Sequence, residues 1–440
     1  MSPARAIWQV SWPMVAIGIL KTGYFLTDAA FVGQLGDEAL SAVGGAAFAW
    51  WMLLLLGEIT GTGVHSLIAR NIGAGRSEDN GPVVMQAVWL ALAIGLFAQV
   101  LHPLAGTYFD LLGFGRSTAE HELGTAYLFA SIAGAGTFAM HAALGGVFRG
   151  IGDTRTVLWI TGVTVLANAM LDPLLIWGWG PIPALGIAGA AWATALANAL
   201  GAFLAALYLP RLGLKFVRKP PDLATLKELL IVGLPVSARG IAFAAIYVVL
   251  GRMITSFGSH EMAAIGVGHR IEGVPYLTSV GFEVGAATLV GQYVGAGDIE
   301  GARRACRTAL HLCVGAMIPC SIGLFFAAET LFELFANEPE TVAAGSLYLR
   351  IQTVAFVMMA FESIYEGGFT GVGRTMPAFW IGAIGTAVRI PLAALLAWPL
   401  GLGVAGIWWA ICLTTIGKGL AMAWVFERHT LSSLAEDQAA

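Results

Sequence analysis

One carboxylate, Asp28, interrupts the first long apolar segment of the chain, residues 7–36. A charged residue at the centre of a bilayer costs at least about 2.5 kcal/mol unless it faces a cavity or a partner. Such a residue is therefore a functional hypothesis by default. An acid that caps a loop at the membrane surface is the alternative. That alternative is disfavoured because a long apolar run precedes Asp28, whereas only eight residues separate it from the next acid, Asp37.

A second acid, Asp172, follows Asn168 by four residues in the apolar stretch LANAMLDPLLIW. Residues four apart share one helical face, and Pro173 removes a backbone donor, which favours a kink. If this face meets Asp28, two carboxylates and an amide share a pocket. Two carboxylates in a low-dielectric site favour sharing a proton. The same oxygens could hold sodium, and the spacing does not decide between the two ions.

Other polar residues interrupt apolar segments. Lys21 lies seven residues before Asp28, about 10 Å away on the same face; it either acts on the charge of Asp28 or extends to the membrane surface. The lone histidines, His65, His141 and His269, favour packing or capping over a proton relay. The second half carries four arginines and four glutamates: Arg239, Arg252, Arg270, Glu272, Glu283, Glu362, Glu366 and Arg389.

Equal numbers of each sign predict a paired polar network in the second half, and Glu362 with Glu366 is its best candidate for a second cation site. Enzyme signals are poor: there is no Walker loop, nucleophile elbow or His-x-x-x-His pair. The four cysteines, at 306, 313, 320 and 412, lack a Cys-x-x-Cys pair. We therefore expect no enzymatic activity, no cofactor and no metal centre apart from the coupling ion.

The elements that must position these residues are transmembrane helices. The chain of 440 residues is 58% hydrophobic and 11% charged, against about 25% charged in a soluble protein. Its apolar runs are long enough to cross a core of about 30 Å, and no basic patch indicates nucleic acid. Twelve spans are predicted, at 7–34, 41–69, 83–111, 121–148, 156–177, 183–209, 225–255, 261–293, 302–327, 341–370, 376–398 and 403–427.

Lysine and arginine gather at alternate connections, which places both termini in the cytoplasm. The longest basic connector, residues 210–222, reads PRLGLKFVRKPPD. We interpret it as the cytoplasmic linker between a six-helix lobe at 1–209 and a second lobe at 223–427. Residues 428–440 form a cytoplasmic tail. The first run is too long for a cleavable signal peptide, so a multi-pass protein of the cytoplasmic membrane is expected.

The two predicted lobes are internal repeats. A shift of 222 places Pro13 on Pro235, Gly36 on Gly258 and Gly63 on Gly285, and a shift of 221 places Phe148 on Phe369. An offset of six spans gives two halves of the same topology, related by an axis along the membrane normal. The same frame places Asp28 on Leu250 and Asp172 on Ala393, so these acids belong to the first half alone.

The chain resembles the multidrug and toxic compound extrusion (MATE) transporters. The matching motifs are Pro13, TDAAFVGQLGDEALSAVG at 27–44, RNIGAG at 70–75, FRGIGDT at 148–154, LANAMLDP at 166–173, GIAGAAWAT at 186–194 and LVGQYVGAGD at 289–298. The resemblance implies two pseudo-symmetric six-helix lobes and is greatest to the DinF-type branch. It implies coupling roles for Asp28, Asn168, Asp172 and Thr194, and a hinge at Pro13. NorM-type relatives carry a C-lobe acid where this chain has Phe243.

The resulting hypothesis is a monomeric antiporter in the bilayer that exports organic cations or amphipathic drugs in exchange for protons. Coupling to sodium at Asp28, Asn168 and Asp172 is the first alternative. A lipid-linked oligosaccharide flippase is the second, because the second-half arginines could bind phosphate. A scaffold or receptor without transport is the third, and it would not need an acid pocket.

Overall fold

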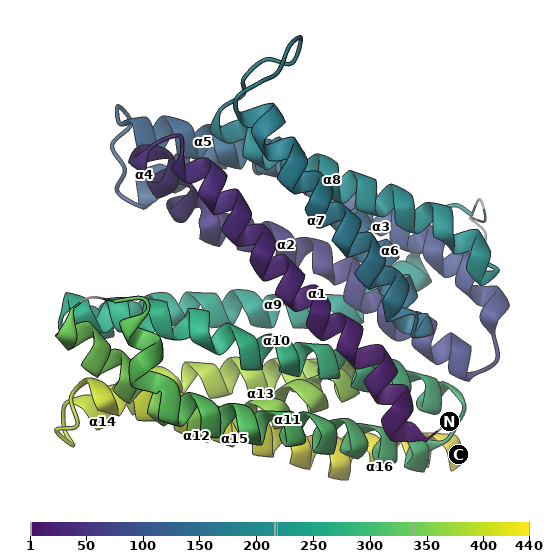
Figure 1. The fold of residues 1–440 in the computed structure, drawn as a ribbon. Helices are drawn as coiled ribbons and strands as arrows, with labels where there is room; N and C mark the ends of the chain where they lie inside the picture. Colours follow the sequence, from purple (N-terminus) through teal and green to yellow (C-terminus); the bar gives the residue numbers. More distant parts are fainter. Residues whose placement is uncertain (1, 215–216, 218, 337, 440) are drawn as a thin grey trace. The chain divides into compact units, whose positions relative to one another are not determined.

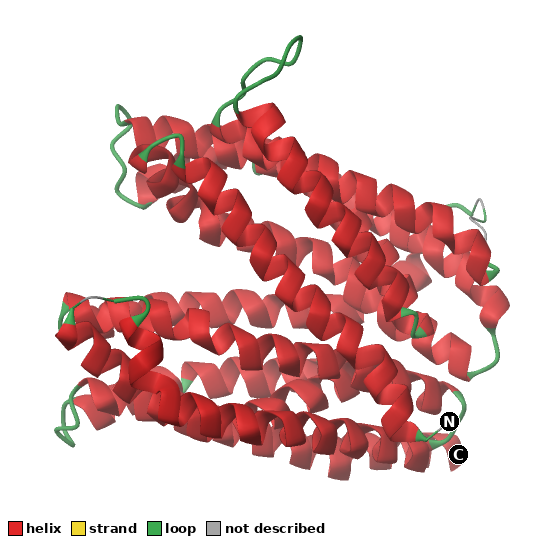
Figure 2. Ribbon diagram, in the orientation of Figure 1, coloured by secondary structure: helices red, strands yellow, loops and turns green. Residues whose placement is uncertain are grey.

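The computed structural model describes residues 2–214, 217, 219–336 and 338–439, and all the regular secondary structure of these residues is helical (Figure 2). Residues 215, 216 and 218 of the predicted linker lie outside the described residues.

The linker leads into α9 (Leu223–Thr255), whose first turn is capped by Asp222. The Asp222 carboxylate accepts hydrogen bonds from the hydroxyl and backbone N–H of Thr225, at 2.6 and 3.2 Å. These bonds hold the pKa of Asp222 below its usual value.

The helices follow one another in two runs of similar order (Figure 1). The first run comprises α1 (Pro3–Gly33), α2 (Asp37–Gly73), α3 (Asn80–Gln99), α4 (Leu104–Leu111), α5 (Ala119–Ala133), α6 (Ala135–Ile151), α7 (Thr154–Ile176) and α8 (Ile187–Tyr208). The second comprises α9 (Leu223–Thr255), α10 (Ser259–Gly295), α11 (Ile299–Glu333), α12 (Pro339–Val372), α13 (Met376–Ala387), α14 (Arg389–Ala397), α15 (Val404–Val425) and α16 (Leu431–Ala439).

Each of the twelve predicted spans coincides with a helix or a pair of consecutive helices. Within the described residues, ten helices are long and apolar enough to cross a membrane, and the α5–α6 pair, bent by 45°, gives an eleventh. The twelfth, α10, has 37 residues but four charged ones, Glu261, Arg270, Glu272 and Glu283. The polytopic all-α prediction is confirmed.

Three predicted spans are not single straight helices. The span at 83–111 is broken between α3 and α4, where Pro103 precedes α4. The span at 121–148 bends at Gly134, which ends α5 and precedes α6. The span at 376–398 is interrupted at Val388 between α13 and α14. Apolar composition indicates that a segment can lie in a bilayer. It does not predict where the backbone hydrogen bonds of the helix are interrupted.

The chain folds into two compact units whose boundaries fall inside helices. Unit 2 is Ala16–Ser237, and unit 1 combines Met1–Val15 with Ala238–Ala440. The predicted division at 210–222 differs from this because the two units exchange the first part of one helix each. The start of α1 packs in unit 1, where Ile7 belongs to the hydrophobic core. The start of α9 packs in unit 2, where Leu229 belongs to the core.

Close helix contacts recur at equivalent positions of the two units. In unit 2, Gly146 of α6 lies against the backbone of Gly61 in α2, and Gly150 lies against the His65 carbonyl. In unit 1, the equivalent glycines of α12, Gly367 and Gly371, lie against the carbonyls of Glu283 and Ala287 in α10. Small residues let helix backbones approach closely in membranes.

The exchanged helix segments also pack in the same way. Gly63 of α2 lies against Leu229 of α9, and its counterpart Gly285 of α10 lies against Ser11 and Ile7 of α1. The paired residues are again 222 positions apart. The repeat found in the sequence is therefore present in the helix packing of both units.

Adjacent glycines of α6 allow a matched test of this packing. A Cβ at Gly146 would collide with the Gly61 carbonyl, whereas a Cβ at Gly145 meets nothing within 4 Å. We expect Gly146→Ala to destabilise the protein by about 1–3 kcal/mol through overpacking. Gly145→Ala should be neutral or stabilise by up to about 1 kcal/mol through helix propensity. Thermal unfolding in detergent, followed by size-exclusion fluorescence, measures both, and equal midpoints would refute the close contact.

Candidate functional site

The polar residues predicted in the first half meet inside unit 2. We call Asp28, Asn168, Asp172 and Thr194 the acid site. Asn168 Nδ2 donates to Asp172 Oδ1 at 3.3 Å and lies 3.5 Å from Thr194 Oγ1. Asn168 and Asp172 are fully buried, and Asp28 lies within electrostatic reach of Asp172. The structure thus brings together α1, α7 and α8 at these four residues.

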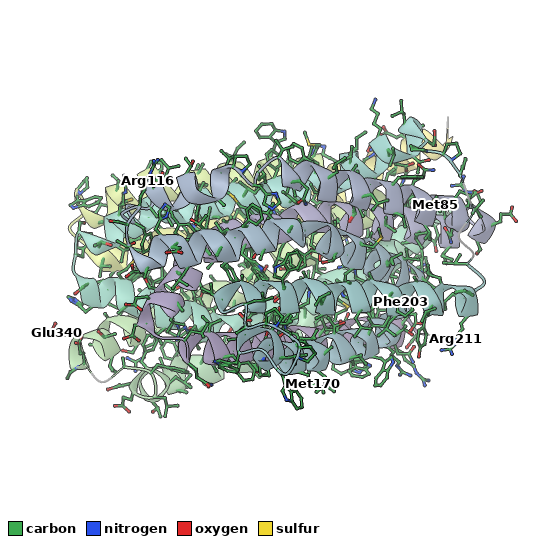
Figure 3. All side chains as sticks on the ribbon, turned by 90° about the horizontal axis from the view of Figure 1, so that it is seen from above. Met85, Arg116, Met170, Phe203, Arg211 and Glu340 are labelled. Atoms are coloured by element: carbon green, nitrogen blue, oxygen red, sulfur yellow. The ribbon has the colours of Figure 1, made fainter. Side chains whose placement is uncertain are left out.

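Local structure explains how α7 presents its pair. Asp153 begins the helix by accepting a hydrogen bond from the backbone N–H of Thr156 at 3.2 Å. From there α7 runs without interruption to Ile176, with Pro173 inside it. Asn168 and Asp172 therefore share the buried face, while Met170 projects to the surface, 67% exposed (Figure 3). An apolar outer face with a polar inner face is the pattern expected of a helix between lipid and a polar interior.

The acid site holds more acceptors than donors. Among the described residues, Asp28 Oδ1, Asp172 Oδ2 and Asn168 Oδ1 are buried oxygens without a hydrogen-bond donor. Unsatisfied buried acceptors cost about 1–3 kcal/mol each, and more when charged. Protonating a carboxylate or binding a cation relieves that cost. The described residues contain no cluster of three or more His, Cys, Asp or Glu that could hold a metal ion.

Two tyrosines at the acid site were not predicted. Tyr24 shares a 2.6 Å hydrogen bond between its hydroxyl and Thr194 Oγ1. Tyr127 of α5 is buried and lies within electrostatic reach of both Asp28 and Asp172. Tyr24 precedes Asp28 by four residues, so helical spacing could have identified it. Tyr127 lies in α5, and no local pattern links it to the others.

Unit 1 contains a paired charge network centred on Glu362. Glu362 Oε1 accepts from Lys418 Nζ at 2.7 Å and from an Arg239 guanidinium nitrogen at 3.3 Å. A second Arg239 nitrogen pairs with Glu366. The structure therefore brings Arg239, Glu362 and Glu366 together. Lys418, which sequence reasoning missed, could have been found as a lysine inside the apolar run of α15.

The other predicted members of the network lie apart from this centre. Arg389 is 1% exposed and donates to the hydroxyls of Tyr247, Thr414 and Thr415, at 3.0, 3.0 and 3.3 Å. Glu272 lies within electrostatic reach of Arg389. Arg270 is exposed and forms no ion pair with any described residue. Of the eight predicted residues, the ion pairs thus join Arg239, Glu362 and Glu366 directly. Glu283 lies within electrostatic reach of Arg239.

A surface hollow between α5 and α8 lies outside the acid site. It is lined by Arg116, His121 and Glu122 together with apolar side chains that include Phe129 and Trp192. None of these belongs to the acid site. Arg116 is bound by the Asp110 carboxylate at 2.7 Å, so the hollow offers no uncompensated cation.

Removing Lys418 should expose the cost of a broken buried ion pair. We expect Lys418→Met to destabilise the protein by about 3 kcal/mol, because Glu362 loses its shortest partner. Glu362→Gln in the same chain should restore most of that loss, since no charge then needs the lysine. The control is Lys227→Met at an exposed position of α9. Thermal unfolding in detergent measures the stability of all three variants. If Lys418→Met alone is as stable as Lys227→Met, the ion pair with Glu362 does not stabilise the protein.

Comparison with known proteins places these features in a family. A protein-family model described as MatE matches residues 13–174 and again residues 235–395. The two matches begin 222 positions apart, which is the register of the internal repeat.

Similar curated proteins and solved structures extend over nearly the whole chain. The Probable multidrug resistance protein NorM of Thermotoga maritima is 27% identical over 409 residues, 92% of this chain and 88% of that protein. The FAD transporter of Shewanella oneidensis is 26% identical over 440 residues, 96% and 94%. A crystal structure of MATE in the bent conformation superposes with a TM-score of 0.91, 24% identity and coverage of 100% of this chain and 98% of that chain.

The structural likeness establishes the fold, and the family model matches both halves of the chain over more than half of its length. The predicted likeness to the DinF-type branch stays a prediction. The multi-pass membrane architecture and the expected family agree with these matches. The chain is therefore a member of the MatE family of membrane transporters.

Proposed function

We propose that this protein is a secondary active antiporter that exports organic cations or amphipathic drugs in exchange for protons. The observation that carries the proposal is the acid site of unit 2. It combines two carboxylates within electrostatic reach of each other and three buried oxygens without donors. A cationic substrate and a proton both relieve the same unsatisfied acceptors, so occupancy by one opposes occupancy by the other.

The energetics are sufficient for export. Each pH unit supplies about 1.4 kcal/mol per proton, so a one-unit gradient supports roughly tenfold accumulation. The membrane potential adds about 2.3 kcal/mol per net charge moved per 100 mV. In this proposal, a proton enters from outside and neutralises Asp28 or Asp172. The substrate then loses its counter-charge and leaves outward, and the proton is released on the cytoplasmic side.

Pro13 is the proposed hinge. Pro13 lies inside α1 and has no backbone N–H to donate to the helix. The boundary between unit 1 and unit 2 follows it, between Val15 and Ala16. A change of packing at the acid site can therefore bend α1 where its backbone is weakest. Pro235 has the same place in α9, before the boundary at Ser237, but Leu250 replaces the acid there.

The basic residues support an orientation with both termini in the cytoplasm, and the proposed protein acts as a monomer in the cytoplasmic membrane. Arg116 and Arg211 lie at opposite ends of unit 2 (Figure 3). Arg116 stands almost alone among basic residues at its end, whereas Arg211 belongs to the basic linker. The excess of arginine and lysine marks the cytoplasmic side.

Two variants of the function use other features. Sodium could replace the proton at Asp28, Asn168 and Asp172, because it also takes oxygen ligands. The flippase alternative depended on second-half arginines that could bind phosphate, but Arg239 is engaged by Glu362 and Glu366. Phosphate binding at that residue would therefore require breaking two ion pairs.

Neutralising the acids tests the coupling directly. We expect Asp28→Asn and Asp172→Asn to reduce ethidium efflux from proteoliposomes under an imposed pH gradient to the background of empty vesicles. The reason is that an amide cannot carry the proton. Asp37→Asn, an exposed acid at the start of α2, is the matched control. Wild-type efflux rates in both variants would refute a coupling role for these acids. If only a sodium gradient drives efflux, the coupling ion is sodium rather than the proton.

The hinge proposal predicts a difference between two prolines. Pro13→Ala restores a helical donor and should slow ethidium efflux while leaving equilibrium binding of ethidium unchanged. Pro235→Ala is the matched control, because it makes the same change in the helix without an acid. The measurement is the ethidium efflux rate of the two variants in parallel, and we expect only Pro13→Ala to be slow. An equal slowing by both substitutions would assign the effect to general helix stiffness.

A further inference from the structure

A second polar cluster lies in unit 2, one segment of α1 away from the acid site. We call it the Lys21 cluster; it consists of Lys21 on α1, Glu58 on α2, and His141 and Arg149 on α6. Arg149 donates to Glu58 Oε2 at 3.3 Å. Lys21 lies within electrostatic reach of both Glu58 and Arg149, and His141 lies within reach of all three. Four side chains from three helices therefore share one electrostatic environment.

The packing of α2 and α6 builds this cluster. Gly61 follows Glu58 by three residues, and Gly146 precedes Arg149 by three. The backbone contact of Gly61 with Gly146 brings the two helices together one turn from the ion pair. The charges of Glu58 and Arg149 act on Lys21, which places this residue of α1 near the contact of α2 with α6.

The Lys21 cluster carries an excess of positive charge. Glu58 is its one carboxylate, and Arg149 already engages it directly. Among the described residues, no carboxylate forms an ion pair with Lys21 within 4 Å. The next acid on the same face of α1 is Asp28, about 10 Å further along the helix. A cation that forms no ion pair can accept an anionic partner without losing an existing one.

The cluster is accessible to such a partner. Lys21 is exposed, and the Glu58 side chain is 39% exposed. The unit 1 network offers a contrast, because Lys418 is 5% exposed and Glu366 is 3% exposed, with both engaged by opposite charges. A solute that reaches Lys21 therefore needs to break no ion pair.

The two polar centres of unit 2 have opposite sign. The acid site has carboxylates and no cation, whereas the Lys21 cluster has two cations and one carboxylate. Lys21 and Asp28 are seven residues apart and lie on one face of α1. A molecule with an ammonium group at one end and a carboxylate at the other matches this pair of charges in both sign and direction.

We propose that Lys21 binds the carboxylate of zwitterionic amphiphilic substrates whose cationic end occupies the acid site. The inference rests on the proposed function, since it assigns a substrate class to the same protein. It differs from export of simple organic cations in requiring an anionic group for tight binding. Arg149 and Glu58 position Lys21, because their ion pair leaves its ammonium free for the substrate.

A matched pair of ligands tests this role without an ion gradient. Norfloxacin carries an ammonium and a carboxylate at opposite ends of the molecule, and its ethyl ester keeps only the ammonium. Binding of each to the full-length protein in a non-ionic detergent at slightly alkaline pH is followed by fluorescence anisotropy. We expect the wild-type protein to bind the acid about tenfold more tightly than the ester, the size of one charge-assisted hydrogen bond.

Three variants separate anion binding from structural effects. Lys21→Met should lose the preference for norfloxacin by weakening its binding about tenfold while leaving the ester unchanged. Lys21→Arg should retain most of the preference because it keeps the charge. Lys227→Met removes an exposed lysine elsewhere in unit 2 and should behave as the wild type. Size-exclusion profiles confirm that each variant is folded.

Two results would overturn the proposal. One is equal binding of acid and ester by the wild-type protein. The other is an equal loss of both ligands in Lys21→Met, which would make the lysine a counter-ion for the acid site rather than a substrate contact. Because the binding assay uses no gradient, a failure of proton coupling leaves its outcome intact. Conversely, ethidium lacks a carboxylate, so its efflux tests the proposed function whichever way the Lys21 result falls.

Discussion

The cost of charge in a low-dielectric interior is the constraint on which this structure depends. A buried charge must be paired, neutralised or supplied with a ligand. Unit 1 pairs the charges at its centre, because Lys418 and Arg239 engage Glu362 and Glu366, while Glu272 keeps a buried oxygen without a donor. In unit 2, Asp28 and Asp172 lie within electrostatic reach of each other, and each keeps an oxygen without a donor. This pair of neighbouring acids is the site at which coupling is proposed.

Two copies of one helical scaffold make this difference visible. Gly146 and Gly367 approach equivalent backbones, and Gly63 and Gly285 hold the exchanged segments of α9 and α1 in the same way. The scaffold thus constrains where small residues must stand, but it leaves the polar residues free to differ. The two acids of this site, Asp28 and Asp172, correspond to the apolar Leu250 and Ala393 of the other unit. The repeat accounts for the shared helix packing, and the polar residues that differ between the units form the proposed coupling site.

The features that could be predicted from the sequence are those that depend on a single residue or on a regular spacing of residues along the chain. Helix length, the repeat register and the shared face of Asn168 with Asp172 follow from local pattern. Tyr127 could not be predicted, because its place beside the acids depends on how α5 packs. The exchange of helix segments between units also escaped, since it is a tertiary contact of Ile7 and Leu229. The electrostatic reach of Lys21 to Glu58 and Arg149 likewise depends on the packing of α2 against α6.

The most direct measurement of the central claim is proton release on substrate binding. Ethidium is added to detergent-solubilised protein in a weakly buffered solution that contains a pH indicator. If substrate and proton compete for Asp28 and Asp172, binding releases protons from the wild-type protein and none from a chain in which both acids are changed to asparagine. Binding of ethidium by the wild-type protein without proton release, or equal release from both proteins, would contradict the account.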